Sequence, residues 1–317
     1  AARADLWAAR QSLAAQVVKI WVALTEANEQ LDLAQTNIVI LDTTVKQAGL
    51  RYDLGVSPAL DVHLARTNLA ATQAAKEQWK SSHQQLCRRL EALLGRYPIG
   101  LIDGVHSLPQ LIPSIPAGIP SGLLERRPDI AASNARIISA RAKIEEAQSE
   151  LHPKLMITAS GGTSTDELKD LLNNNSTVWS FGSNIVQPIL DGKQRRNNVV
   201  LQDTIAAEFI LNHRRTVLSA FSEVETALSN EVILQSREKL LQEAAIQAAK
   251  ALKLAEDRYS RGLEPFVIIL EAQRRLTEAR SQRVSARRMR LENRANLHLA
   301  LGGDFLKPDP LKFGIKK

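Results

Sequence analysis

A turn motif that occurs twice constrains this chain more than any other feature. It reads Arg51-Tyr52-Asp53-Leu54-Gly55-Val56-Ser57-Pro58 and again Arg258-Tyr259-Ser260-Arg261-Gly262-Leu263-Glu264-Pro265, with Arg, Tyr, Gly and Pro at a constant offset of 207 residues. A Gly after a helical run is a C-cap signal, because it adopts a left-handed conformation without a Cβ clash. A Pro three residues later begins the next helix. Each copy therefore predicts the tight turn of a helical hairpin, and the fixed offset predicts a duplicated chain.

Long helices are predicted on both sides of each turn. Residues 1–51 contain no Gly or Pro before Gly49, and residues 193–260 contain none. At ~1.5 Å per residue these two helices would be about 75 and 100 Å long, which indicates an elongated assembly. Return helices are expected over residues 59–94 and 265–301. Heptad spacing, typical of a packed seam, runs along the first helix at Leu24, Ala27, Leu31, Ala34, Ile38, Leu41, Val45 and Ala48. An apolar face is also expected on the longest helix, at Val217, Phe221, Val224, Leu228 and Val232.

The stretch between the two copies has a different composition. Residues 95–122 hold five Pro and five Gly, which predicts an irregular connector. Pro128 and Asp129 then begin a helix that ends near Leu151, because Pro and an acid suit the first helical turn. We therefore divide the chain into a first repeat at 1–94, a connector at 95–121, a second repeat at 122–303 and a tail at 304–317.

Within residues 154–190 the periodicity changes from helical to alternating. Apolar residues stand at every second position in two stretches, Leu155-Ile157-Ala159 and Trp179-Phe181-Ile185, with small or polar residues between them. This pattern predicts two strands. Because a two-stranded hairpin is not stable alone in water, it needs a partner. Two interpretations stay open from periodicity alone: strands of a membrane β-barrel built from several chains, or a small soluble hairpin packed on helices.

Composition argues against several classes of protein. The single Cys87 excludes a disulfide framework and a multi-cysteine metal site, and the six His show no metal-binding spacing. No apolar run is long enough for a transmembrane helix. No catalytic constellation or phosphate-binding loop is visible, so we predict no enzyme, no cofactor and no metal. Residues 274–294 carry eight Arg; because Glu and Gln are interleaved and aromatic residues are lacking, we interpret this stretch as a solvated helix face rather than a nucleic-acid site.

Four motifs together give the chain a family likeness. They are Leu123-Leu124-Glu125-Arg126-Arg127-Pro128-Asp129-Ile130, Pro188-Ile189-Leu190-Asp191-Gly192, the two Arg-Tyr-x-x-Gly turns, and Leu270-Glu271-Ala272-Gln273-Arg274. On these residues the chain resembles the TolC-type outer-membrane efflux factors, in particular the NodT/OprM-like branch. Two departures are His152 before Pro153, where the family usually has Phe, and Glu271, where Asp is common. Family members begin with a signal peptide, often a lipid-bearing Cys, an upper helix and a first strand pair, so we expect a fragment that starts within the first long helix.

The resemblance implies a mainly α fold with a small β part. Duplicated helical hairpins of three chains would form an α-barrel, the strand pair would contribute to a trimeric 12-stranded membrane β-barrel, and the connector would belong to a girdle around the helices. The implied function is the exit duct of a tripartite efflux or multidrug-export system, which passes small molecules passively from the periplasm across the outer membrane of a Gram-negative bacterium. The implied partners are two further copies of the chain, a periplasmic adaptor protein, an inner-membrane pump of the RND or a related type, and outer-membrane lipid.

The resemblance also assigns site residues. The two turns would contact the adaptor through Leu54, Gly55, Val56, Arg261, Gly262 and Leu263. Glu271 and Arg274 match positions that narrow the periplasmic end into a gate. The alternative for this pair is a surface ion pair between residues three apart on a helix, and the alternative for Tyr52 and Tyr259 is that they simply pack at the hairpin ends. The alternative function is a structural coiled-coil protein of the cell envelope.

Overall fold

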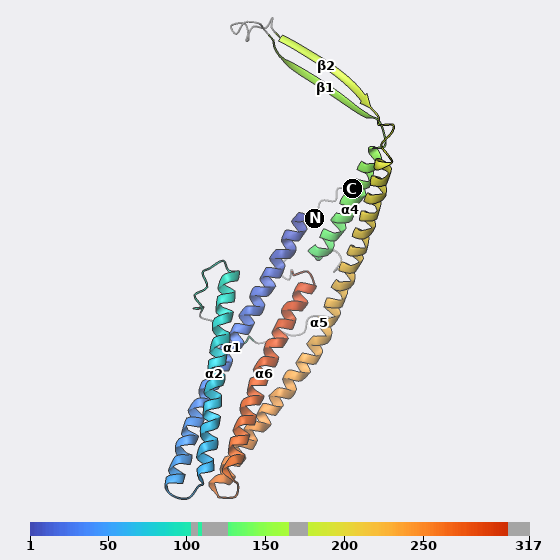
Figure 1. Ribbon diagram of the computed structural model, residues 1–317. Helices are drawn as coiled ribbons and strands as arrows, with labels where there is room; N and C mark the ends of the chain where they lie inside the picture. The colour runs from blue at the N-terminus through green and yellow to red at the C-terminus, as the bar shows by residue number, and fades with distance from the viewer. Residues whose placement is uncertain (103–106, 110–125, 165–176, 304–317) are drawn as a thin grey trace. The chain divides into compact units, whose positions relative to one another are not determined.

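The computed structural model of the protein describes residues 1–102, 107–109, 126–164 and 177–303. In these ranges the fold is mainly helical with one small sheet, as predicted (Figure 1). The elements are α1 (Ala2–Asp53), α2 (Ala59–Leu93), α4 (Pro128–Ser149), β1 (Lys154–Thr163), β2 (Thr177–Val186), α5 (Gln194–Ser260) and α6 (Phe266–Ala300). Most of the predicted connector, the first part of the Leu123–Ile130 motif and the whole predicted tail lie outside the described residues.

The chain divides into two compact units. One comprises Ala1–Ala4 and Asp129–Leu218, and the other comprises Asp5–Pro128 and Ser219–Lys317. In the larger unit, α1, α2, α6 and the second part of α5 run alongside one another, and the α1–α2 and α5–α6 turns lie at the same end (Figure 1). This end is referred to below as the tip.

The predicted duplication is visible in the packing of the larger unit. Away from the tip, α1 and α2 enclose a core of Ile20, Leu24, Cys87 and Leu90, and α5 and α6 enclose a core of Val224, Ala227, Leu297 and Ala300. Ile20 and Leu90 correspond to Ala227 and Leu297 at the offset of 207 residues. The two hairpins therefore pack by equivalent positions. Cys87 is a free, fully buried thiol in the first of these cores, as expected of a small packing residue.

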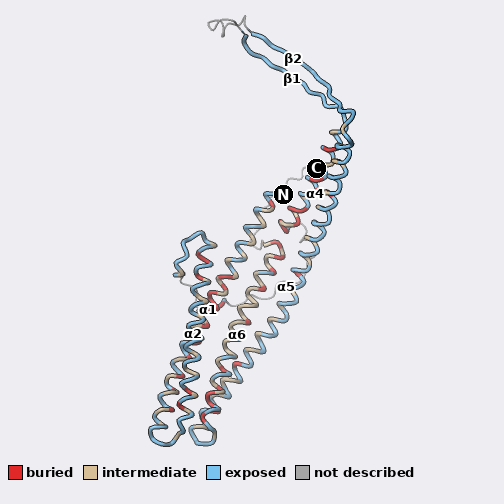
Figure 2. Tube along the Cα trace, in the orientation of Figure 1, coloured by how far each residue is buried: buried red, intermediate tan, exposed pale blue. Residues whose placement is uncertain are grey.

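A third core joins the two hairpins at the tip, and Figure 2 shows the buried residues along its helices. It is built from Ala48, Val62, Ala65, Ala255, Phe266, Ile269, Leu270 and Ala272. Three of these residues in the first hairpin have their counterparts in the second: Ala48 with Ala255, Val62 with Ile269, and Ala65 with Ala272. The Ala side chains in this core are small, and α2 of the first hairpin lies close to α6 of the second, so each hairpin stabilises the other.

The predicted heptad on α1 is confirmed, whereas the predicted face on α5 holds only in part. Ala27, Ala34, Leu41 and Ala48 are buried at steps of seven, and the heptad positions between them are half-buried. On α5, Val224 is buried but Val232 is 69% exposed. The expectation for Val232 is wrong for the single chain, because the face of α5 that meets α6 continues through Ala227, Leu228 and Glu231 rather than through Val232.

In the smaller unit, α4 lies beside the first part of α5. Ser133 and the His213 ring nitrogen Nδ1 are 2.8 Å apart, and the Arg195 guanidinium donates to the Glu150 carbonyl at 2.7 Å. β1 and β2 form a two-stranded antiparallel sheet in which Ala159 pairs with Phe181. Both predicted strands are thus confirmed, and the register fixes their faces.

One face of this sheet carries most of its large apolar side chains, and the other is mixed, with Met156, Val178 and Val186 among polar and small residues. Leu155, Ile157 and Ala159 share a face with Ile185, Phe181 and Trp179, and all the residues of both strands are exposed in the single chain. On the other face, the hydroxyls of Ser160 and Ser180 are 2.7 Å apart. None of the described helices is both long and apolar enough to cross a membrane.

Candidate functional site

The two turns at the tip have the same backbone geometry. Gly55 and Gly262 have φ angles of +72° and +74°. In the first turn the Gly55 N–H donates to the Tyr52 carbonyl at 2.8 Å, and the Val56 N–H donates to the Arg51 carbonyl at 2.9 Å. The second turn repeats both bonds at 2.9 Å, from Gly262 to Tyr259 and from Leu263 to Arg258. This paired pattern is the Schellman motif, which satisfies the last carbonyls of a helix and requires a left-handed residue.

The proline of each turn begins the next helix. Pro58 has φ −72° and ψ 155°, and Pro265 has φ −73° and ψ 152°. Because the ring fixes φ near −65° and removes the N–H, proline suits the N-cap position before α2 and α6, while α1 and α5 have already ended at Asp53 and Ser260. The Gly and the Pro of the predicted motif therefore set the turn geometry in both copies.

The six turn residues that the resemblance assigns all lie exposed at the tip. Leu54, Val56 and Leu263 are 76%, 63% and 64% exposed, and Gly55, Arg261 and Gly262 are exposed as well. Leu60 and Val267, one helical turn further on, are 62% and 47% exposed. The structure thus gathers the predicted residues on one surface, which we call the tip surface. Large apolar side chains gathered in the open are typical of surfaces that bind another protein.

The two turns contact each other through Arg51 and Tyr259. Both copies of the motif carry an Arg and a Tyr at these positions, so the motif does not show which of them meet. The Arg51 guanidinium lies 4.8 Å from the centroid of the Tyr259 ring, which in turn lies 5.6 Å from the Phe266 ring. Tyr52 is instead 50% exposed. The alternative that the tyrosines simply pack at the hairpin ends is therefore correct for Tyr259 and wrong for Tyr52, because the position equivalent to Phe266 is Ala59, which offers no ring.

Glu271 and Arg274 form an exposed ion pair on α6, beside Leu270 and Ala272 of the tip core. Two nitrogens of Arg274 donate to the two carboxylate oxygens of Glu271, each at 2.9 Å. Arg275 adds a third bond at 2.7 Å, and Arg274 also faces Glu278 at 3.5 Å. The hydrogen bonds from Arg274, then those from Arg275, lower the pKa of Glu271 from 4.5 to about 2. Within the described residues of one chain, these partners all come from the same helix, which is the geometry of a surface pair.

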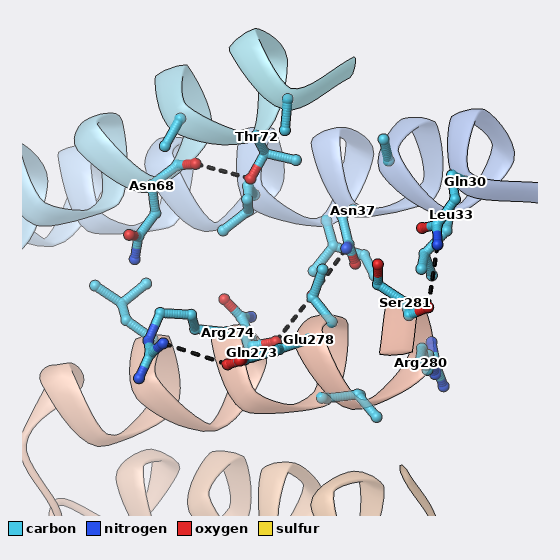
Figure 3. Close-up of a pocket in the computed structure, with 18 of the residues that line it drawn as sticks. Gln30, Leu33, Asn37, Asn68, Thr72, Gln273, Arg274, Glu278, Arg280 and Ser281 are labelled. Atoms are coloured by element: carbon cyan, nitrogen blue, oxygen red, sulfur yellow. Dashed lines mark hydrogen bonds and ion pairs between the residues drawn. The ribbon is translucent and has the colours of Figure 1, made fainter. Parts of the chain in front are cut away.

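A polar seam between α1 and α6 was not identified from the sequence. Gln30, Asn37 and Thr44 are 2%, 9% and 8% exposed. They are spaced seven residues apart and adjoin the apolar heptad, which is the signal that could have revealed them. Among the hydrogen bonds that cross the seam are those from Ser285 to Glu26 at 2.6 Å, from Gln30 to the Ser281 carbonyl at 3.0 Å, and from Asn37 to Thr277 at 2.8 Å, the last two of which are drawn in Figure 3. The seam therefore fixes the register of α1 on α6 by polar contacts.

The described residues contain no group of three or more His, Cys, Asp or Glu side chains that could hold a metal ion. The residues that the resemblance assigns form an exposed tip surface and an exposed ion pair.

Comparison with known proteins agrees with this architecture. A family described as "Outer membrane efflux protein" matches residues 1–96 and 119–303. OprJ, an outer membrane protein of Pseudomonas aeruginosa, is 32% identical over 84% of this chain and 56% of its own length. TtgF, a toluene efflux pump outer membrane protein of Pseudomonas putida, is 28% identical over 95% of this chain and 63% of its own length. The chain thus spans less than two thirds of these curated relatives.

Two solved structures share the fold. The outer-membrane channel OprN superposes with a TM-score of 0.89 at 26% identity, covering 96% of this chain and 68% of that one. The open state of the outer membrane channel MtrE of Neisseria gonorrhoeae superposes with a TM-score of 0.84 at 28% identity, covering 95% and 68%. Because the family model matches most of the chain, the chain belongs to the outer membrane efflux protein family, and the protein is an outer-membrane protein.

Proposed function

We propose that the protein is the exit duct of a tripartite efflux or export system. In this proposal three copies form a tunnel from the periplasm through the outer membrane, and small molecules cross it passively. The observation that carries the proposal is the pair of equivalent turns with exposed apolar residues, on a chain that belongs to an efflux family. The relative TtgF is a toluene efflux pump outer membrane protein, which favours a duct over a structural coiled-coil protein.

The tip surface is the proposed docking site for a periplasmic adaptor protein. Leu54, Val56 and Leu263 would supply the apolar contact, and Arg261 would supply a charged rim. Gly55 and Gly262 would contribute by shape, because their left-handed conformation sets the direction in which the neighbouring side chains point. The adaptor would in turn link the duct to an inner-membrane pump of the RND or a related type.

Glu271 and Arg274 are the proposed periplasmic gate. Three copies of a charged pair near a narrow end would place a ring of charges around the entrance, a common way to restrict passage. The bidentate geometry, with both Arg274 bonds at 2.9 Å, supports an ordered rather than a mobile pair. In an assembled trimer, the same guanidinium could exchange partners between neighbouring chains when the entrance opens.

The test of the duct is complementation in cells that lack the endogenous protein. The full-length gene should restore resistance to exported compounds when the adaptor and pump are present. The double variant Gly55→Val with Gly262→Val should lose export and keep its trimer, because a β-branched residue resists a positive φ while a Cβ at either position meets no atom within 4 Å.

The matched control is Gly49→Val, a glycine within α1 that likewise has no atom within 4 Å of an added Cβ. This variant should retain export. Normal export by the double variant would refute the docking assignment, and unchanged sensitivity to a broad panel of compounds on deletion of the gene would refute the duct itself.

A further inference from the structure

The connection from β2 to α5 is held in place close to the end of α4 (Figure 1). The Asp191 carboxylate accepts hydrogen bonds from the Lys193 N–H at 3.0 Å and from the Arg195 N–H at 3.3 Å. The Arg195 guanidinium lies 3.8 Å from Asp191 and donates to the Glu150 carbonyl, just after α4, at 2.7 Å. The chain segments that lead into and out of the strand pair are therefore tied together at this junction.

Within the junction, Lys193 adopts a backbone conformation that favours glycine. Its φ is +68°, directly after Gly192 at +61°, and among the described residues it is the only one other than glycine with a positive φ. A side chain in this region costs free energy that glycine avoids. Strain of this kind is typical of positions where the side chain has a role. We therefore looked for what the Lys193 side chain provides.

The charge of Lys193 is not neutralised by the described part of the chain. Its ammonium group has no partner among the described residues, and neither has the guanidinium of Arg196, three residues further on. Both side chains are exposed. The other two cations of the junction face acids, since Lys154 lies 3.6 Å from Glu150 and Arg195 lies beside Asp191. Lys193 and Arg196 are thus the surplus positive charges of the junction.

Two large apolar side chains stand next to these charges. Ile189 and Leu190 are 90% and 96% exposed, more than any other large apolar residue of the described ranges. The strands that end here have ten residues each, which at ~3.3 Å per residue is about the length needed to cross a membrane. If the strand pair crosses the outer membrane, the junction lies where the acyl chains meet the headgroups.

We propose that Ile189, Leu190, Lys193 and Arg196, which we call the junction surface, bind anionic phospholipid at the periplasmic face of the outer membrane. The apolar pair enters the edge of the acyl-chain layer, and the two cations meet headgroup phosphates. This binding gives the strained Lys193 a role that glycine does not fill. The inference rests on the proposed function, because it requires the strand pair to lie in the membrane.

The test reconstitutes the full-length protein in nanodiscs that contain equal amounts of phosphatidylglycerol and phosphatidylcholine with the same acyl chains. Native mass spectrometry then counts the lipids that stay bound. We expect phosphatidylglycerol to be retained in preference to phosphatidylcholine. The variant Lys193→Gln with Arg196→Gln should lower this preference by about 5-fold or more, because each cation near an anionic surface contributes about 5-fold in affinity at low salt.

A second variant separates lipid binding from a purely structural role. Lys193→Gly should raise the melting temperature in detergent, because the backbone strain is relieved, and should nevertheless lower the preference for phosphatidylglycerol, because the charge is lost. Lys193→Arg should keep the preference. A structural role alone would move stability and lipid preference in the same direction.

The matched control is Arg214→Gln with Arg215→Gln, two exposed arginines on the same helix. They lie about 27 Å further along α5 than Arg196, which is beyond the range of headgroup charges at physiological salt. This variant should retain lipids as the unmodified protein does.

Protein that fails to enter nanodiscs would overturn the proposed function together with this inference. Protein that enters them would overturn the inference alone if it showed no preference for phosphatidylglycerol, an unchanged preference in Lys193→Gln with Arg196→Gln, or an equal loss in the control. A preference lost only together with the trimer, whose mass the same spectra give, would assign the junction surface to a second copy of the chain instead.

Discussion

The guanidinium of Arg51 lies 4.8 Å from the ring centroid of Tyr259, and this contact joins the turn of the first hairpin to that of the second. Tyr259 also packs on Phe266, which is buried in the tip core. The contact thus connects an arginine at the end of α1 to the core that holds the four helices together. In this way the two copies of one motif become parts of a single surface.

We predict that Arg51 and Tyr259 are energetically coupled. A double-mutant cycle with Arg51→Met and Tyr259→Leu should give a coupling energy of about 0.5 to 1 kcal/mol in urea unfolding, the range of exposed cation–π pairs. The control cycle replaces Tyr259→Leu by Tyr52→Leu, at the equivalent and half-exposed tyrosine. That cycle should show coupling near zero; equal coupling in both would mean that the ring contact contributes nothing specific.

Glycines at the turns and within α1 should respond in opposite directions to the same substitution. Gly55→Ala and Gly262→Ala should each destabilise the protein by about 1 to 2 kcal/mol, because alanine must adopt a positive φ. Gly49→Ala should stabilise it by about 0.5 to 1 kcal/mol, because Gly49 is helical. An added Cβ meets no atom within 4 Å at any of the three sites. Differences in stability among the three variants therefore report backbone conformation and not steric clashes. Melting temperatures that shift in the same direction at all three sites would contradict the backbone argument.

The Glu271 carboxylate should titrate far below the usual range. Its pKa in the folded protein is about 2, against 4.5 for the ordinary group. A lowered pKa means that the ion pair stabilises the fold above about pH 4.5 and that this contribution is lost as the pH falls towards 2. Carbon-detected NMR of labelled Glu should show this, and Arg274→Gln with Arg275→Gln should return the pKa towards 4.5. A pKa near 4.5 in the unmodified protein would show that the bidentate pair does not persist in solution.

If the proposed gate rests on this pair, opening it should raise conductance. Glu271→Ala with Arg274→Ala should increase the passive single-channel conductance of the full-length protein in planar bilayers, because the ring of paired charges is lost. The matched control removes another exposed ion pair, Asp42→Ala with Lys46→Ala, whose charges lie 2.7 Å apart on α1. Conductance that changes in neither variant, or equally in both, would leave only the surface-pair interpretation.

The two adjacent arginines of the motif before α4 should differ in their effect on stability. Arg127 is 8% exposed and donates to Glu223 at 2.8 Å and to the Ala300 carbonyl at 3.1 Å, whereas Arg126 is exposed. Arg127→Met should destabilise the protein by about 1.5 to 3 kcal/mol, since it removes charge-assisted hydrogen bonds at the C-terminal end of α6. Arg126→Met should change stability by less than about 0.5 kcal/mol. Equal losses in thermal melting would show that the motif acts through its charge alone.

Local sequence patterns determined the elements of this protein. Gly55 and Gly262, each followed by a proline, fixed both turns, because few residues tolerate a positive φ and proline cannot continue a helix. The absence of Gly and Pro from residues 194–260 determined the length of α5. The alternation of apolar residues with small or polar residues determined the two strands. These signals act over a few neighbouring residues, so they can be read without knowing what packs where.

Only the tertiary structure decided whether two residues at the same position of the two repeats have the same neighbours. Tyr52 and Tyr259 occupy the same position in the motif, yet only Tyr259 lies against a ring and beneath Arg51. Gln30 and Asn37 are polar in the sequence and buried in the fold, because Ser281 and Thr277 of α6 meet them across the seam. Burial and pairing of this kind depend on residues about 240 to 250 positions away, and a local pattern carries no information about such a partner.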